Sequence, residues 1–333
     1  MENIDLHRWI YQSTETLWDH RSNSPIKFDE NNLIFSSKKF QFNFLNKTDI
    51  PNFFLDDDST ITNRQGKFYN EVLFPNYDDF DDFSALLDKG SRSLFTKMLD
   101  GELPYNSKIL ELGCGTGQLS IYLSRFNRQI HGVDISKGSL KLGEKFRKEN
   151  SREKVFFSRM NVFNLIFKKN YFDCIVSNGV LHHTKDAKLA FANLTEHLKP
   201  GGHIVIGLYH KYGRLITNIK QAVSPYLGDK IRFFDKTLRT MKNKKKKIAW
   251  KMDQFFNPHE TSHTLLELIE WFDDHGIEYV NSIPFDFHDG NKLFGQRERP
   301  SPIRLRLTEP LLAFSAKQIR EGGFFVIIGK KII

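Results

Sequence analysis

A glycine-rich turn with an acidic residue just ahead of it is the part of the sequence best suited to bind a ligand. The apolar run Ile109–Leu112 leads into Gly113-Cys114-Gly115-Thr116-Gly117, and Glu111 stands within the run. Glycine allows positive φ and close approach of a ligand, because it has no Cβ. A lone glycine cluster is a weak signal, so the surrounding residues decide what it binds.

The spacing of this turn argues against a dinucleotide. A pyrophosphate-binding turn follows G-x-G-x-x-G, whereas the spacing here is G-x-G-x-G and Gln118 stands where the third glycine would be. Glu111 would repel a pyrophosphate but attract a ligand that carries an ammonium and a sulfonium. The turn therefore favours a cationic adenosine ligand over NAD.

A second acid ends the next predicted strand. Asp134, in Gly132-Val133-Asp134-Ile135-Ser136, lies 21 residues after Gly113. A carboxylate here can accept hydrogen bonds from both hydroxyls of an adenosine ribose. The alternative is that Asp134 only caps the helix that follows.

With these motifs, the stretch from Ser91 to Tyr209 resembles the class I S-adenosylmethionine-dependent methyltransferases. The resemblance extends to Met160-Asn161-Val162, to the segment from Phe172 to His183, and to Leu198-Lys199-Pro200-Gly201-Gly202. It implies S-adenosylmethionine as cofactor and S-adenosylhomocysteine as product. It also implies that cofactor-binding residues are Glu111, Gly113, Gly115 and Gly117 at the methionine moiety, Asp134 at the ribose with Ile135 beside it, Asn161 and Val162 at the adenine, and Asn178 closing the pocket.

Asn161 stands where many relatives have Asp, so its amide oxygen would accept the hydrogen bond from the adenine amino group. Methyl transfer from a sulfonium is an in-line displacement. Most of the acceleration should come from holding acceptor, methyl and sulfur collinear in a pocket closed to water. A general base is needed only if the acceptor must lose a proton.

Catalytic candidates lie at the ends of the fourth and fifth strands. They are His183, which we prefer, His182 and Tyr209, although packing on the sheet would equally explain them. Candidates for binding the acceptor are Tyr69, Tyr77, Tyr212, His259 and His263.

The two later histidines are candidates for a metal site. His259 and His263 are four residues apart and would share a helix face. However, Pro258 and a cap at Thr261 or Ser262 indicate that the helix begins later. We therefore predict no metal and interpret this segment as a helix start or an acceptor-binding loop.

Strand-like apolar runs alternate with helix-length amphipathic segments from Ser91 onward, which is typical of βαβ units. The pattern predicts an α/β fold with a seven-stranded, mostly parallel, doubly wound sheet. Predicted strands are 108–112, 130–134, 155–159, 172–177, 203–209, 279–283 and 324–328, and predicted helices are 118–125, 137–150, 187–198 and 261–275.

Composition divides the chain into an N-terminal lid region, residues 1–88, and a methyltransferase domain, residues 89–333. Insertions are expected at about 210–260 and 284–320, both on the surface because long irregular segments are costly to bury. The N-terminal part shows no long periodic element and should fold over the cofactor.

The positive charge is confined to one segment. The chain of 333 residues has a net charge of +9, and residues 217–251 alone contain eleven Lys or Arg and two Asp. The segment predicts an amphipathic helix over Gly228–Lys251 with a cationic face that includes the run from Lys242 to Lys247. This cationic face either lies in solvent or binds an anionic acceptor, an acidic partner, a membrane surface or RNA phosphates.

Two cysteines cannot form a disulfide framework, and the start of the chain has no secretory pattern, so a cytoplasmic location is expected. No apolar run is long enough to span a membrane. The sequence leaves the oligomeric state open.

Together these features predict a methyltransferase that acts on a small-molecule acceptor. The alternatives are an RNA or protein methyltransferase that docks through the lysine-rich insertion, and a non-catalytic S-adenosylmethionine-binding protein.

Overall fold

The computed structural model describes residues 15–45, 48, 50–71, 77, 82–227, 247–248, 251–252, 256–284, 292–314 and 323–332. Lysines 242–246 and most of the predicted basic helix, 228–251, lie outside the described residues.

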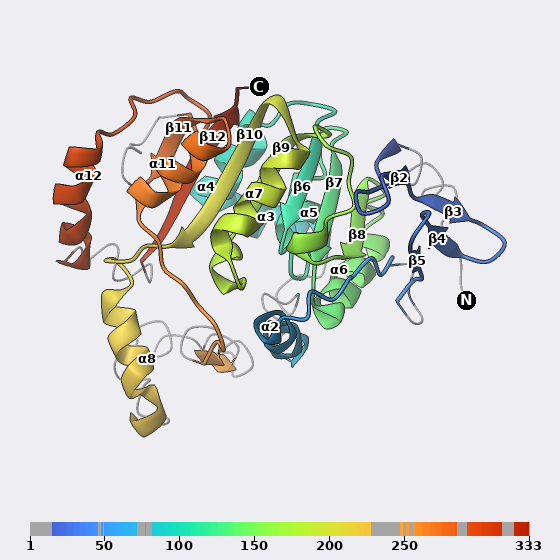
Figure 1. Cartoon of the computed structure of the whole chain (residues 1–333), viewed down its shortest axis with the longest axis horizontal. Helices are drawn as coiled ribbons and strands as arrows, with labels where there is room; N and C mark the ends of the chain where they lie inside the picture. Colours follow the sequence, from blue (N-terminus) through green and yellow to red (C-terminus); the bar gives the residue numbers. More distant parts are fainter. Residues whose placement is uncertain are drawn as a thin grey trace.

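A seven-stranded sheet forms the centre of the molecule, as predicted (Figure 1). The spatial order is β11-β12-β10-β9-β6-β7-β8, and only β12 runs antiparallel to its neighbours. The strands are β6 (Lys108–Leu112), β7 (Gln129–Asp134), β8 (Val155–Arg159), β9 (Phe172–Asn178), β10 (Leu198–Tyr209), β11 (Ile277–Ile283) and β12 (Phe324–Lys331). All seven predicted strands are present, and the largest differences are at β10, which begins five residues earlier, and β12, which ends three residues later.

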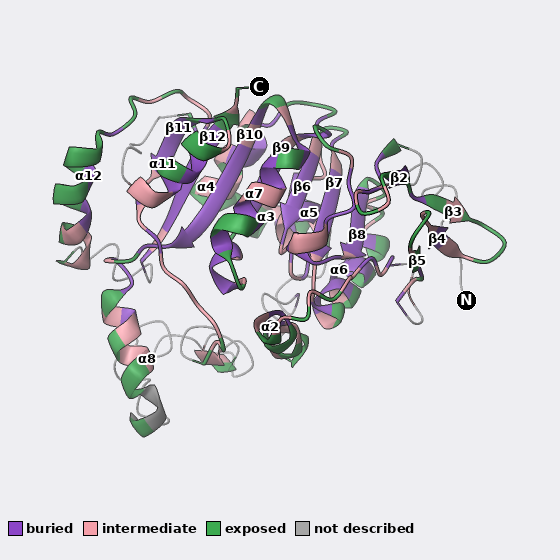
Figure 2. Ribbon diagram, in the orientation of Figure 1, coloured by how far each residue is buried: buried purple, intermediate pink, exposed green. Residues whose placement is uncertain are grey.

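Helices cover both faces of the sheet, which explains why its strands are apolar on both sides. Adjacent residues of one strand point to opposite faces, and Ile109 and Leu110 of β6 accordingly enter two different apolar clusters. Helices α7 (Ala187–His197) and α11 (Leu265–Asp274) pack on one face, and α3 (Phe83–Ser91), α4 (Leu94–Glu102), α5 (Gln118–Leu123) and α6 (Lys137–Glu149) on the other. Figure 2 shows the buried strands between these layers.

Three of the helices that pack on the sheet begin at polar caps. The side chains of Ser136, Asp186 and Thr264 accept hydrogen bonds from the first turns of α6, α7 and α11. The cap of α11 is therefore Thr264, and the prediction of Thr261 or Ser262 was wrong. The cause is that residues 261–263 are held in extended conformation against β10, where His263 donates its N–H to the carbonyl of Tyr209 at 2.9 Å.

Ahead of α3, the described residues of the N-terminal region include two small sheets and the helix α2 (Thr60–Glu71), at the end of the molecule drawn at the right and bottom of Figure 1. Its strands are β1 (Trp18–Asp19), β2 (Ser24–Pro25), β3 (Lys27–Asp29), β4 (Ile34–Ser36) and β5 (Gln41–Phe42). Helix α3 spans the boundary expected at residue 88.

Both predicted insertions contain surface helices. They are α8 (Leu215–Leu227) in the first, and α12 (Pro302–Thr308) with the 3-10 segment η4 (Glu309–Phe314) in the second. Two further 3-10 turns follow sheet strands, η1 (Val162–Asn164) and η2 (Leu181–His183). Across the described ranges, no helix combines the length and the hydropathy needed to cross a bilayer.

Candidate functional site

The glycine turn joins the end of β6 to the start of α5 and is fixed to the neighbouring strand β7. The backbone N–H groups of Gly113 and Cys114 donate to the carbonyl of Val133 at 2.8 and 3.1 Å. Gly113, Gly115 and Gly117 all have positive φ, a conformation that other residues adopt only with strain. The turn is therefore a rigid loop at the carboxyl edge of the sheet, where open α/β sheets bind ligands.

Two of the glycines are also required by packing within the protein. A Cβ on Gly113 would lie 2.3 Å from a methyl of Val180, and a Cβ on Gly117 would lie 2.1 Å from the ring of Phe157. Approach of a ligand, the reason expected from the sequence, is therefore not the only reason for glycine at these positions. The structure adds that side chains of the protein already occupy the space on one side of the turn.

Asp134 lies beside the turn and is not the helix cap. Its two carboxylate oxygens accept from the N–H groups of Gly115 at 2.8 Å and Ser136 at 2.7 Å, while the cap of α6 is Ser136 itself. Burial raises the pKa of Asp134, and these backbone donors and Arg159 oppose the rise. Each oxygen keeps a lone pair with which it could accept a further hydrogen bond.

Glu111 is buried beneath the turn. The hydroxyl of Ser120 in α5 donates to its carboxylate. Burial raises the pKa of Glu111 to about 7, and the nearby charge of Asp134 adds to this. A cation bound at the turn would favour the ionised form.

The adenine candidates lie at the end of β8. Asn161 is buried, and its side-chain oxygen accepts from the N–H of Phe163 at 3.1 Å. Its amide nitrogen has no hydrogen-bond partner in the part of the chain that the structure describes. The amide nitrogen is thus left for a ligand, and the oxygen keeps a second lone pair for the hydrogen bond expected from the adenine amino group.

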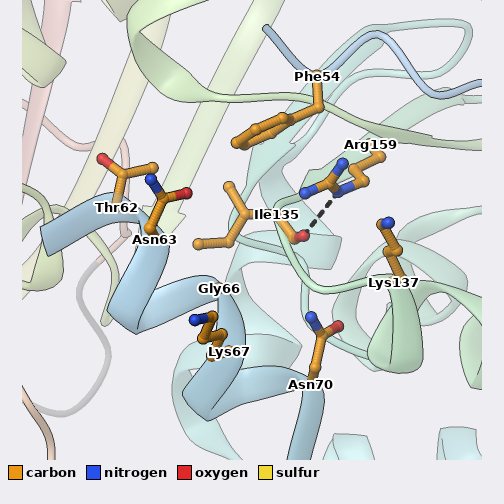
Figure 3. Close-up of a pocket in the computed structure, with 9 residues that line it drawn as sticks. All are labelled: Phe54, Thr62, Asn63, Gly66, Lys67, Asn70, Ile135, Lys137 and Arg159. Carbon is orange, nitrogen blue, oxygen red and sulfur yellow. Dashed lines mark hydrogen bonds between the residues drawn. The ribbon is translucent and has the colours of Figure 1, made fainter. Parts of the chain in front are cut away.

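A cavity of ≈ 270 Å³ opens beside Ile135, between α2 and the ends of β7 and β8 (Figure 3). The guanidinium of Arg159 lies 3.9 Å from the ring centre of Phe54, and its Nε donates to the carbonyl of Ile135 at 2.9 Å. The lining residues are Phe54, Thr62, Asn63, Gly66, Lys67, Asn70, Ile135, Lys137 and Arg159. Three of the nine are cationic and none is acidic.

Asn178 ends β9 next to the turn that carries the histidine pair. Its side-chain oxygen lies 2.1 Å from the position that a Cβ on Gly207 would take, so β10 needs glycine there. Val162 is buried in the apolar core.

His182 and His183 occupy different environments in η2. His182 is fully buried, its ring centre is 4.3 Å from that of Tyr209, and neither ring nitrogen has a partner among the described residues. Burial lowers the pKa of His182 well below its ordinary value, and neighbouring His183 and Arg214 lower it further. His182 is therefore neutral at physiological pH.

His183 is oriented by a backbone group. Its Nδ1 lies 2.9 Å from the carbonyl oxygen of His259. A carbonyl can only accept, so in the neutral ring the hydrogen is assigned to Nδ1 and the lone pair to Nε2. That lone pair is what a general base would use.

An extended segment, 256–264, links η2 to α2, and we call it the strap. The amide of Gln65 in α2 donates to the side chain of Asn257 at 2.7 Å and to the carbonyl of His259 at 2.8 Å. Asn257 in turn donates to the hydroxyl of Tyr69 at 2.9 Å. The N–H of Thr261 donates to the carbonyl of His182 at 2.8 Å.

A buried ion pair ties the strap to the end of β10. Arg214 donates through two nitrogens to the carboxylate of Glu260, both at 2.8 Å, and its guanidinium lies 3.5 Å from the ring centre of Tyr209. Neither contact could be predicted from local spacing, because Gln65 and Asn257 are 192 residues apart and Arg214 and Glu260 are 46 residues apart.

The remaining candidates do not meet at this place. His263 uses both ring nitrogens, toward Glu267 and Thr261, in the approach to α11. Tyr77 donates to the carbonyl of Thr116 at 2.7 Å and stacks on Phe146, so it supports the glycine turn from the side of α6. Tyr212 lies past β10 beside His210.

The described residues contain no group of three His, Cys, Asp or Glu side chains placed to hold a metal. Residues 256–264 are also not helical, so His259 and His263 do not share a helix face.

Comparisons with known proteins concern the segment that contains the glycine turn and the strands around it. Residues 110–206 match the family model described as a methyltransferase domain. An uncharacterised protein of Synechococcus is 24% identical over 216 residues, covering 57% of this chain and 52% of its own. A demethylmenaquinone methyltransferase of Lactiplantibacillus plantarum is 31% identical over 151 residues, covering 44% of this chain and 62% of its own.

Among solved structures, PKMT2 from Rickettsia typhi, in complex with AdoHcy, is 16% identical with a TM-score of 0.52. The alignment covers 73% of this chain and 53% of that one, and this likeness bears on the fold alone. The chain spans between half and two thirds of the length of the two curated relatives. It carries a methyltransferase domain with the class I, S-adenosylmethionine-dependent fold.

Proposed function

We propose that the protein transfers a methyl group from S-adenosylmethionine to an oxygen, nitrogen or sulfur atom of a small-molecule acceptor. The observation that carries this is the pair of acids around the glycine turn, with Glu111 below it and Asp134 bonded to Gly115. A ligand with positive charge and ribose hydroxyls matches both acids, whereas a pyrophosphate would be repelled.

The charges around the turn would also orient the cofactor. The acids lie at the turn, and the cationic side chains lie around the cavity beyond Ile135. The sulfonium and ammonium would therefore point toward Glu111, and the neutral adenine toward Asn161 and Val162. The bound cofactor supplies the methyl group, and its sulfur leaves as a neutral thioether.

The acceptor would enter beside η2, where the strap and α2 would shield it from water. Neutral His182 adds no charge that would repel the sulfonium. His183 is held in the tautomer that could take a proton from an acceptor that must lose one. These roles, and that of Tyr209, are proposals from position.

A small acceptor is supported by the relative that acts on demethylmenaquinone. The alternatives to be tested are methylation of RNA or protein and a protein that binds S-adenosylmethionine without turnover. The charge of the acceptor is also to be tested. A cytoplasmic location stays a prediction from the two cysteines, both of which are free and buried.

The test is conversion of radiolabelled S-adenosylmethionine in three reactions, with small metabolites, with RNA or with protein from a cell extract. Transfer of the labelled methyl group only to a small molecule that separates from S-adenosylmethionine would support the proposal. Label that enters RNA or protein instead would refute the acceptor class. Tight cofactor binding without turnover in any fraction would indicate a binding protein.

A further inference from the structure

Helix α2 meets the acceptor side with a polar side chain rather than an apolar one. Among the 12 residues of α2, only Thr62 and Gln65 are buried, and Gln65 is 3% exposed. A buried amide costs free energy unless its hydrogen bonds are made. The polar character of Gln65 therefore directs attention to the hydrogen bonds that it makes with the strap.

The orientation of the Gln65 amide is fixed by its partners. The carbonyl oxygen of His259 can only accept, so the atom of Gln65 that lies 2.8 Å from it is the nitrogen. The second partner of this nitrogen is Oδ1 of Asn257 at 2.7 Å, which also accepts from the N–H of His259 at 3.2 Å. Gln65 thus donates to the strap at two points.

The carbonyl of His259 also holds the ring of His183. Nδ1 of His183 lies 2.9 Å from this oxygen, which is therefore bonded from two sides, by Gln65 of α2 and by His183 of η2. A carbonyl oxygen has two lone pairs, enough for both donors. Gln65 thus fixes the position of the atom that orients the His183 ring.

Helix α2 is anchored on both sides of Gln65. In its first turn, the hydroxyl of Thr62 donates to Asp57 at 3.1 Å, and Asp57 pairs at 2.7 Å with Lys185, just after η2. In its last turn, the carbonyl of Tyr69 accepts from the hydroxyl of Ser136, the cap of α6, at 2.8 Å. Gln65 lies between these anchors, so it supports the strap from a fixed helix.

We propose that Gln65 is a positioning residue for His183. By holding the carbonyl of His259, it keeps the hydrogen of the neutral His183 ring on Nδ1 and the lone pair on Nε2. This is the tautomer that can take a proton from an acceptor. The inference deepens the proposed function and rests on it, because the tautomer of His183 serves methyl transfer only when an acceptor must lose a proton.

The test is a long-range proton–nitrogen NMR spectrum of the protein with its histidine ring nitrogens isotopically labelled, recorded at about pH 8, above the ordinary pKa of histidine. The spectrum shows which ring nitrogen carries the hydrogen, and a His183→Gln variant assigns the signals of His183. We expect the wild type to carry the hydrogen on Nδ1. In Gln65→Leu, the ratio of the Nδ1–H to the Nε2–H tautomer should fall about 5-fold, as for the loss of one hydrogen bond.

The matched control is Thr62→Val, which removes the other buried polar group of α2 and leaves the hydrogen bonds to the strap in place. It should not change the tautomer of His183, whereas a merely structural role of Gln65 would make the two variants alike. Circular dichroism shows whether each variant folds. If Gln65→Leu does not, Gln65→Met removes the same donors with an unbranched side chain.

Three results would overturn the inference: a wild type whose His183 does not carry a single hydrogen on Nδ1, an unchanged ratio in Gln65→Leu, or an equal change in Thr62→Val. The spectra need no acceptor, so they separate this inference from the proposed function. The proposed function fails instead if no small molecule is methylated.

Discussion

The two sides of the candidate site are built differently. On the cofactor side, the polar groups of the turn come from adjacent strands and are satisfied by backbone atoms, as when Asp134 accepts from Gly115 and Ser136. On the acceptor side, partners come from remote parts of the chain, as when Gln65 holds the strap through Asn257 and His259. The cofactor side is part of the sheet, and the acceptor side is assembled around it.

The acceptor side also holds several of the buried polar atoms that lack partners among the described residues. They include the side-chain oxygen of Gln65, both ring nitrogens of His182 and Nε2 of His259. Buried polar groups without partners are costly unless a ligand or water satisfies them. On the cofactor side the amide nitrogen of Asn161 is also without a described partner, but the glycine turn and Asp134 are held by backbone hydrogen bonds. We therefore expect the turn to be fixed before ligands bind and the acceptor side to be completed by what it binds.

Gly117→Ala should have the largest effect on stability, because it changes the tightly packed glycine turn of the cofactor side. The new Cβ would meet the ring of Phe157 at 2.1 Å and would be strained at φ +75°. We expect the free energy of unfolding to fall by about 4 kcal/mol, which urea denaturation measures. Cofactor binding should be lost as well, which calorimetry measures. Gly276→Ala, at φ +64° with open space around it, should cost only about 1 kcal/mol. Equal costs would show that the turn is not rigidly packed.

Glu111→Gln should change how stability depends on pH. An acid whose pKa is raised from 4.5 to about 7 binds its proton more tightly in the folded chain. The wild type should therefore lose about 3 kcal/mol of stability as pH rises from about 4.5 to about 7. The variant should lack this loss, and the exposed control Glu149→Gln should keep it. Denaturation at several pH values measures the effect; a wild type whose stability is flat over this range would contradict the burial argument.

Asp134→Ala should weaken S-adenosylmethionine binding by about 2 kcal/mol or more, because the ribose hydroxyls lose charged acceptors. Asp186→Ala is the matched control, since Asp186 follows the strand β9 and caps α7. It should lower stability by about 1 kcal/mol and leave cofactor affinity unchanged. Calorimetry on both variants distinguishes ribose binding from helix capping. Unchanged affinity in folded Asp134→Ala would refute the ribose assignment.

Gln65→Leu should have the smallest effect and act on the other side. It removes the donors to Asn257 and His259, which should cost about 1 kcal/mol. Hydrogen exchange should speed up in the strap but not at the glycine turn, and cofactor affinity should stay the same. If the turn also loosened, the two sides would not be independent.

The sequence predicted the cofactor side far better than the acceptor side. The sheet strands are apolar runs bounded by turn signals, so local patterning identifies them. The glycine turn and Asp134 are close in sequence as well as in space, and they were found together.

The acceptor side left no such pattern. Helix α2 buries only Thr62 and Gln65, so it lacks the apolar periodicity by which helices are recognised. The strap is held by side chains from α2 and η2 and by Arg214, contacts that no local spacing reveals. His182, His183 and Tyr209 were predicted at the ends of neighbouring strands, but only the fold shows that Tyr69 and His259 lie beside them.

Binding of S-adenosylhomocysteine and of NAD to the purified protein, compared by calorimetry, tests the central claim most directly. The acids at the glycine turn predict that S-adenosylhomocysteine and S-adenosylmethionine bind and that NAD does not. Binding of NAD together with no response to either sulfur nucleoside would contradict the account.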